Sequence, residues 1–116
     1  MNTKIEALEA KYREYADAYG AAIERGDHKM ANRNHDKLAA LLPKLRECSD
    51  KGEAALRRLM KDQSDAVAAW AATHSLPFAE ADALKVLDVI AQKAGLAAFD
   101  AKMVARQWRK GELKIR

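Results

Sequence analysis

Residues 53–76 constrain the fold of this chain more strongly than any other stretch. They read EAALRRLMKDQSDAVAAWAATHSL, which predicts one helix, a short polar turn and a second helix that opens with Asp65 and Val67. A helix–turn–helix unit of this kind cannot bury its apolar face alone, so it stacks on neighbouring units. Architectures built from such units usually offer a binding surface rather than a reactive centre.

The composition indicates one small helical domain. The chain has 116 residues, of which 49% are apolar and 33% charged, and this balance excludes a disordered or low-complexity protein. Much of the apolar share is alanine, which favours helix and lets helices approach closely. Val, Ile and Thr never alternate over the length of a strand, so no sheet is expected. We therefore expect residues 1–116 to form a single all-α domain.

The sequence lacks the patterns of a membrane or secreted protein. No apolar run approaches the length that spans a bilayer, and the stretch MNTKIEALEAKYREY is charged throughout, unlike a secretory signal. The one cysteine, Cys48, cannot form an intramolecular disulfide, which fits a reducing compartment. These observations predict a cytoplasmic protein.

About six helices are expected from the apolar spacing and from helix start and stop signals. Their expected ranges are 4–25, 28–47, 51–61, 65–75, 79–94 and 101–110. The first two carry apolar stripes in steps of three and four: Ile5, Leu8, Tyr12, Tyr15, Tyr19 and Ala22, then Ala31, Asn34, Leu38, Leu41, Leu45 and Cys48. Two such helices joined by a tight turn predict an antiparallel hairpin.

Caps and breakers define this hairpin. Gly26 stands where the first helix needs a left-handed residue to end, and Asp27 follows as the cap of the second. Thr3 with Glu6 has the spacing of a capping box at the start of the first helix. Pro43 predicts a kink or a break in the second helix, because it cannot donate to the carbonyl four residues before it.

Similar signals set the later helix ends. Asp50 is the expected cap of the third helix, and Gly95 is expected to stop the fifth. Asp100 is the expected cap of the sixth, with Phe99 and Val104 spaced as a hydrophobic staple around it.

Four aromatic side chains could mark a ligand site: Trp70, His74, Phe78 and Trp108. In a two-layer repeat the second helices line the concave side, so Trp70 and Trp108 could lie near each other with His74 one turn beyond Trp70. One interpretation is a pocket with an aromatic wall and a titratable neighbour. The alternative, which the alanine-rich composition favours, is that these rings fill gaps in the core.

The C-terminal helix carries a basic face. Net charge is +4, and the last sixteen residues hold six basic residues against one acid. Lys102, Arg106, Arg109 and Lys110 lie one helical turn apart or adjacent, so a single face is geometrically possible. This face could bind phosphates or an acidic protein. The alternative, which we favour, is a solvated helix face with cations near a helix C-terminus.

Sequence patterns for metal, cofactor or covalent chemistry are missing. His28, His35 and His74 share no recognised metal-binding spacing with Cys or carboxylate residues. No G-x-S-x-G, glycine-rich phosphate loop or dinucleotide fingerprint occurs. We expect no cofactor, no metal and no catalytic residue.

Three segments carry a family resemblance: NRNHDKL (32–38), WAATHSLPF (70–78) and FDAKMVARQWRKGEL (99–113). Through them the chain resembles the bacterial domain of unknown function family 2019, a family of small ARM/HEAT-like helical proteins. Residues 55–78 also resemble a HEAT repeat, although Ala68 stands where HEAT repeats commonly carry an arginine. The resemblance implies a right-handed helical repeat and no established activity, so no catalytic residue carries over. Pro43 departs from the family pattern.

Together these features predict an N-terminal helical hairpin packed on two helical-repeat units. The function we expect is non-enzymatic protein binding through the concave face or the basic end, and one version is an immunity or antitoxin-like protein. The alternative is a weak nucleic-acid or anionic-ligand binder that uses the basic C-terminal helix. An enzyme with its site around Trp70 and His74 is the least supported class.

Overall fold

All regular elements in the described part of the chain are helices, which confirms the all-α fold. The computed structural model describes the backbone of residues 3–113. Its six helices are α1 (Thr3–Arg25), α2 (His28–Glu47), α3 (Asp50–Leu59), α4 (Asp65–Ser75), α5 (Glu80–Ala91) and α6 (Leu96–Arg109). The capping box expected of Thr3 lies outside the described side chains. Within residues 3–113 no helix combines the length and the apolar character needed to cross a membrane.

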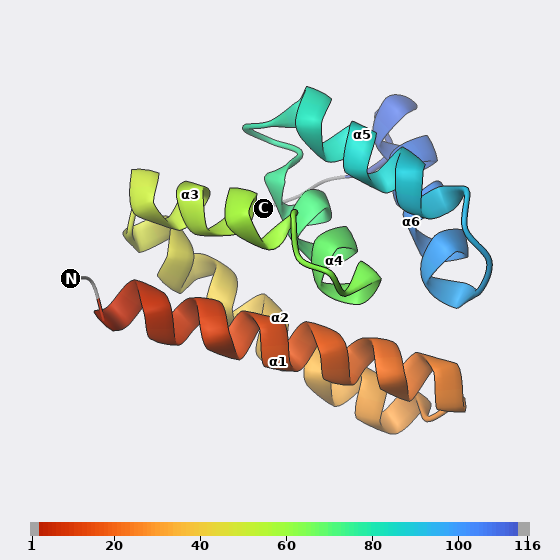
Figure 1. The fold of residues 1–116 in the computed structure, drawn as a ribbon, viewed down its shortest axis with the longest axis horizontal. Helices are drawn as coiled ribbons and strands as arrows, with labels where there is room; N and C mark the ends of the chain where they lie inside the picture. The colour runs from red at the N-terminus through yellow and green to blue at the C-terminus, as the bar shows by residue number, and fades with distance from the viewer. Residues whose placement is uncertain (1–2, 114–116) are drawn as a thin grey trace.

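The predicted hairpin is confirmed (Figure 1). Gly26 adopts a φ of 73°, and the Asp27 carboxylate accepts a hydrogen bond of 3.1 Å from the backbone N–H of Met30. Most residues of the predicted stripes are buried, whereas Tyr15, Tyr19 and Cys48 are only half-buried. On α1 the buried apolar residues are Ile5, Leu8, Tyr12, Ala16 and Ala22. On α2 the buried residues are Ala31, Asn34, Leu38, Leu41 and Leu45.

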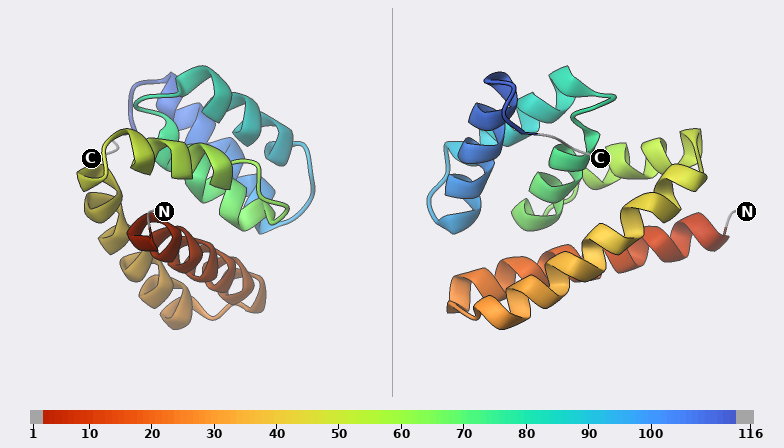
Figure 2. Two further views of the ribbon diagram at one scale, coloured as in Figure 1. Left: turned by 60° about the vertical axis from the view of Figure 1, so that its left-hand side comes forward. Right: turned by 180° about the vertical axis from the view of Figure 1, so that it is seen from behind.

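Of the kink or break predicted at Pro43, the break is wrong. The helix continues through it to Glu47, and its C-terminal half rises away from α1 toward α3 (Figure 2). Both Pro43 and Ala39 are exposed. Pro43 has no N–H to donate to the carbonyl of Ala39, so this carbonyl can accept a hydrogen bond from water instead. The helix loses one hydrogen bond, but no buried polar group is left unpaired.

The remaining helices form two further pairs, α3 with α4 and α5 with α6 (Figures 1 and 2). Helix α4 is central and contacts α1, α3, α5 and α6. Helix α1 also contacts α6, so the first pair meets the third as well as the second. In an open helical stack each unit contacts only its neighbours. The described chain instead closes on itself as a compact globule, and a right-handed repeat stays a prediction.

Two glycines allow close helix approaches. A Cβ on Gly52 would lie 2.0 Å from the backbone carbonyl oxygen of Leu45, so α2 and α3 meet backbone to backbone at their corner. A Cβ on Gly20 would lie 2.7 Å from the Cβ of Ala66, so α1 and α4 are nearly as close. Any side chain at Gly52 would force the corner to shift, since real Cβ atoms do not approach oxygen so closely.

The expected cap of α3 is wrong by one residue. Ser49 is the N-cap, with a φ of 50°, and Asp50 is the first helical residue. The connection from α2 consists of Cys48 and Ser49 alone, so the chain reverses within two residues and Asp50 enters the helix. In the first turn of α3, the negative charge of Asp50 still interacts favourably with the positive N-terminal end of the helix. The next turn follows the prediction, because α4 begins at Asp65 and the Ser64 hydroxyl accepts from the Val67 N–H.

The boundary between α5 and α6 also differs from the prediction. Helix α5 ends at Ala91, and a tight turn follows in which the N–H of Lys93 donates to the carbonyl of Ile90 at 3.0 Å. Gly95, with a φ of 101°, then starts α6 at Leu96 rather than ending α5. Asp100 therefore lies inside α6 and is not its cap. The predicted staple is wrong too, because Phe99 is 59% exposed.

Candidate functional site

A groove of about 230 Å³ lies between α1, α4 and α6. Its walls are mostly apolar, with Leu87 of α5 also contributing. Helix α1 provides Tyr19, Gly20, Ile23 and Glu24. Helix α4 provides Ala66, Ala69, Trp70 and Thr73, and α6 provides Ala97, Asp100, Ala101, Met103, Val104 and Gln107. The small side chains of Gly20 and Ala66 bring α1 and α4 together at the base, and the larger ones form the walls.

Trp70 connects the groove to an aromatic cluster. Its ring meets the ring of Tyr19 at 5.2 Å and 83°, an edge-to-face arrangement that aromatic pairs favour. His35 of α2 lies 5.4 Å from it and His74 lies 5.5 Å from it, centroid to centroid. The predicted binding residue Trp70 therefore has two roles in this structure, since it packs the hairpin against α4 and lines the groove.

His74, the second predicted binding residue, is part of the core. It is buried, and the hydroxyl of the fully buried Tyr12 lies 2.6 Å from its Nδ1. Burial lowers the pKa of His74 to about 3, with smaller contributions from the charges of Arg46 and His35. The imidazole is therefore neutral near pH 7. The Tyr12 hydroxyl has no other acceptor among the described residues, so we assign the tautomer protonated on Nε2, in which Tyr12 donates and Nδ1 accepts. Burial likewise raises the pKa of Tyr12 well above its usual value.

The structure does not bring Trp70, His74 and Trp108 into one pocket. His74 lines a second cavity of about 240 Å³ together with Arg46 and Phe78. Trp108 is half-buried, lies outside the groove lining, and donates from Nε1 to the Glu80 carboxylate at 3.2 Å. The aromatic partner of Trp70 in the groove is Tyr19, which the sequence interpretation treated only as part of the α1 stripe.

The predicted basic face of α6 is only partly free. Arg109 makes two hydrogen bonds to the Asp88 carboxylate, at 3.0 and 2.7 Å. This contact holds the pKa of Asp88 below its usual range and raises that of Arg109. Lys102, Arg106 and Lys110 are exposed and form no ion pair with the other residues that the structure describes. Three cations, rather than four, remain available to an anionic partner.

Two exposed apolar side chains adjoin the groove. Leu96 is 45% exposed and Phe99 is 59% exposed, both on the first turn of α6. Helix spacing places Leu96 one turn before Asp100 and Phe99 one turn before Met103, two residues that line the groove. The sequence reasoning missed this feature, because Phe99 was assigned to a staple before a helix that in fact had already begun.

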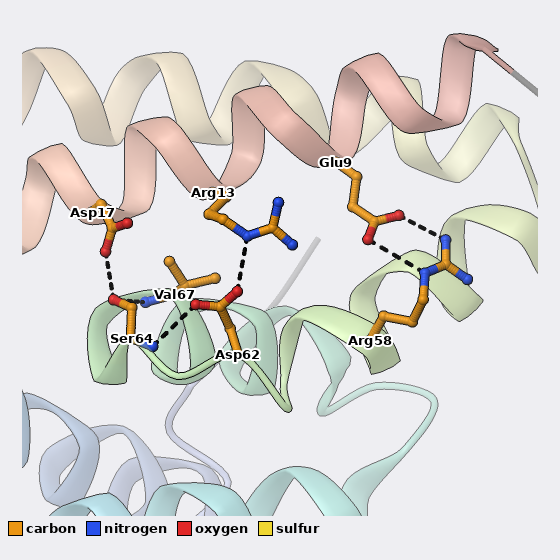
Figure 3. Close-up of polar contacts among 7 residues, drawn as sticks. All are labelled: Glu9, Arg13, Asp17, Arg58, Asp62, Ser64 and Val67. Atoms are coloured by element: carbon orange, nitrogen blue, oxygen red, sulfur yellow. Dashed lines mark hydrogen bonds and ion pairs between the residues drawn. The ribbon is translucent and has the colours of Figure 1, made fainter.

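A row of polar contacts holds α1 against α3 and the turn that follows it (Figure 3). Its α1 members recur every four residues and so share one helix face. They are Glu9, Arg13 and Asp17. The Glu9 carboxylate accepts from Arg58 at 2.6 and 3.3 Å. Arg13 Nε donates to Asp62 at 2.8 Å, which helps to lower the pKa of Asp62.

The third contact of the row also caps α4. The Ser64 hydroxyl donates to the Asp17 carboxylate and accepts from the backbone N–H of Val67 (Figure 3). The backbone N–H of Ser64 in turn donates to the Asp62 carboxylate at 3.0 Å. The start of α4 is thereby attached to α1, and both helices form the base of the groove.

Metal binding finds no support in the described residues, which contain no group of three or more His, Cys, Asp or Glu side chains placed to hold an ion. The groove lining combines apolar walls, the aromatic rings of Tyr19 and Trp70, and the carboxylates of Glu24 and Asp100.

The fold is similar to that of a solved protein. The crystal structure of the protein RPA1889 from Rhodopseudomonas palustris CGA009 matches with a TM-score of 0.86, over 97% of this chain and 93% of that one. Sequence identity is 22%, so the likeness establishes the fold and nothing about activity. No family model matches the chain, and no curated protein matches it in sequence.

Proposed function

We propose that this protein is a non-enzymatic module that binds another protein through the groove between α1, α4 and α6. The observation that carries the proposal is the exposure of Leu96 (45%) and Phe99 (59%) on the α6 turn beside an apolar groove. Large apolar side chains kept in water next to a concave apolar surface are typical of interaction sites. The occupant we propose is a partner segment that presents apolar side chains to this edge.

The state of His74 supports a non-enzymatic role. A general acid or base works best with a pKa near the operating pH. The pKa of His74 is about 3, its Nδ1 is occupied by Tyr12, and it lies outside the groove lining. His74, which the enzyme hypothesis required as a titratable group, is therefore better suited to packing in the core than to acid–base catalysis.

A second candidate function is weak binding of a nucleic acid or another anionic ligand. The observation that favours it is the exposure of Lys102, Arg106 and Lys110 on one end of α6 without partners among residues 4–113. The pairing of Arg109 with Asp88 reduces the available positive charge. Phosphate contacts of this number give affinity that falls steeply with salt and carry no sequence preference.

The family resemblance supports the same class of function. We infer membership of the bacterial domain of unknown function family 2019 from the three quoted segments, and an ARM/HEAT-like repeat from residues 55–78. Helical-repeat proteins generally use their concave surfaces for binding. An immunity or antitoxin-like role would be one instance, supported only by size and architecture.

The test is affinity capture with matched surface variants. The tagged protein is used as bait with a Leu96→Ser/Phe99→Ser double variant, whose positions are exposed, so the fold should be retained. Val89→Ser is the control, since Val89 is also 54% exposed but lies on α5 outside the groove. We expect a partner whose recovery falls about tenfold or more with the double variant and is unchanged with the control.

Variants of the basic face separate the two candidate functions. Lys102→Glu/Arg106→Glu should leave such a partner bound if the groove is the site. Loss of binding in this variant alone, together with retention in Leu96→Ser/Phe99→Ser, would contradict the groove proposal and favour the anionic-ligand function. Titration of a fluorescent single-stranded oligonucleotide at low salt measures that second function directly.

A further inference from the structure

The groove is negatively charged in a protein that is positively charged overall. Its lining contains the carboxylates of Glu24 and Asp100 and no Lys, Arg or His. The whole chain has 21 Lys and Arg against 17 Asp and Glu. Neither carboxylate forms an ion pair or hydrogen bond with another residue of the described part. The charge of the groove is therefore not neutralised from within.

The two carboxylates are not equivalent. Glu24 is exposed, and one of its oxygens lies 3.8 Å from the position of a Cβ built on Gly95, at the start of α6. The positive end of α6 partly compensates its charge there. Asp100 lies in the second turn of α6, and desolvation raises its pKa. Asp100 is exposed as well, but it lies beyond the first turn of α6, so the helix end compensates its charge less than that of Glu24.

Aromatic rings face the same space. Tyr19 and Trp70 meet at 83° and form two walls of the groove, and the charge of Asp100 contributes to raising the pKa of Tyr19 after the larger effect of burial. The Asp100 carboxylate and the Tyr19 ring line the same groove. Aromatic faces and a carboxylate both attract an organic cation, and the attraction grows when water is excluded.

We propose that the groove receives a cationic side chain, lysine or arginine, from the partner protein. Its apolar stem lies against the Ala97, Ala101 and Val104 wall, and its charge lies between Tyr19, Trp70 and Asp100. The volume of about 230 Å³ suits one long side chain rather than a folded element. This inference rests on the proposed function, and it adds that the partner's anchor is basic, which fits the charge of the groove.

The probe for this inference is hexylammonium, which combines a lysine-like stem with one positive charge. Hexan-1-ol and hexanoate also contain six carbon atoms and serve as the neutral and anionic controls. Binding is followed by the indole N–H signals in a ¹⁵N-correlated NMR spectrum of the whole protein. The Trp70 signal reports on the groove, and the Trp108 signal, whose Nε1 donates to Glu80 outside it, is the internal control.

We expect hexylammonium to shift the Trp70 signal with an affinity of roughly millimolar, and to leave the Trp108 signal in place. Asp100→Asn should weaken that binding about threefold or more. Asp82→Asn removes the same charge from an exposed residue of α5 outside the groove, and it should leave the affinity for hexylammonium unchanged.

Three results with the ligands would overturn the inference, and a fourth would come from the variants. These are equal binding of hexan-1-ol and hexylammonium, stronger binding of hexanoate, or no shift of the Trp70 signal with any of the three. A partner that is lost with Leu96→Ser/Phe99→Ser would in each case still support the proposed function, so the two failures are distinguishable. Equal weakening by Asp82→Asn and Asp100→Asn would show that net charge, not the groove, attracts the cation.

Discussion

Helix α1 is attached to the rest of the molecule by two faces of opposite character. One face carries Tyr12, which is fully buried and bonded to His74 of α4 at 2.6 Å. The other carries the polar row of Glu9, Arg13 and Asp17, which reaches α3 and the start of α4 across the surface (Figure 3). Both faces join the hairpin to the same neighbouring pair of helices.

The difference between these faces shows how burial decides the strength of a contact. A buried tyrosine removes a large apolar area from water, and truncating such a residue costs about 3–5 kcal/mol. A solvent-exposed ion pair contributes about 0–1 kcal/mol, because water and salt screen it. We therefore expect the Tyr12 face to provide the stability, while the polar row fixes the relative orientation of α1 and α4.

The largest effect should come from Tyr12. Tyr12→Ala is expected to lower the free energy of unfolding by about 3–5 kcal/mol, since the site is fully buried and cannot be refilled by solvent. Tyr12→Phe should cost less, about 1–3 kcal/mol, because it leaves Nδ1 of His74 without its donor. Urea unfolding measures both. A loss below about 1 kcal/mol for Tyr12→Ala would contradict the comparison.

The pH dependence of stability should identify His74. Its pKa falls from 6.5 to about 3 on folding. Between these two pH values His74 is protonated in the unfolded chain but neutral in the folded protein. The stabilisation is fully present above the unfolded pKa and is lost progressively as pH falls toward the folded value. From about pH 7 to about pH 4.5 the expected loss is about 2.5 kcal/mol.

His74→Phe separates this contribution from that of other groups. Its absolute stability will be lower, but its loss between the same two pH values should nearly disappear. His28→Gln is the control, because His28 is exposed and should leave the loss unchanged. Equal pH dependence in His74→Phe and the natural chain, measured by urea unfolding, would show that burial of this imidazole does not control acid stability.

A smaller effect is expected at the contact between Gly20 and Ala66. Gly20→Ala places a methyl group 2.7 Å from the Ala66 Cβ, which α1 and α4 can accommodate only by moving apart. Overpacking costs about 1–3 kcal/mol, and the better helix propensity of alanine offsets up to about 1 kcal/mol. Adding Ala66→Gly should restore the packing, although glycine costs about 1 kcal/mol of helix propensity in α4. The cycle therefore includes the Ala66→Gly single variant, and additive effects of the two substitutions would exclude this contact as the cause.

The smallest effect should come from the polar row. Glu9→Gln is expected to cost about 0.2–1 kcal/mol, since its partner Arg58 is half exposed. The cost should shrink further in about 1 M NaCl, where charges are screened within a few ångströms. Thermal unfolding of Glu9→Gln and the natural chain at low salt and in about 1 M NaCl measures this cost. A cost that matched Tyr12→Phe and did not respond to salt would erase the distinction between the two faces.

The sequence predicted the hairpin well because its two stripes repeat over many turns. Tyr12 and Leu38, both fully buried, lie where the three-four spacing placed them. Gly26 and Asp27 act as local signals whose meaning does not depend on the rest of the fold. Long, regular elements with unambiguous caps are the features that single-sequence reasoning reads best.

The boundary before α6 failed because its signals were ambiguous. Gly95 can end one helix or precede the next, and Asp100 can cap a helix or lie inside one. The groove was only half predicted for a related reason. Trp70 was identified, but Tyr19 and Asp100 join it only because α1 contacts α6, a long-range contact that no local pattern encodes.

The backbone contact at Gly52 has a consequence for the groove. Only a hydrogen atom separates the Cα of this residue from the Leu45 carbonyl. The close contact therefore restricts the angle at the corner between α2 and α3, where the hairpin joins the later helices. Of the helices that line the groove, α1 belongs to the hairpin before this corner, whereas α4 and α6 follow it. The width of the groove therefore depends on Gly52, a residue that does not line it. A methyl group at this position would change the angle between the hairpin and the later helices.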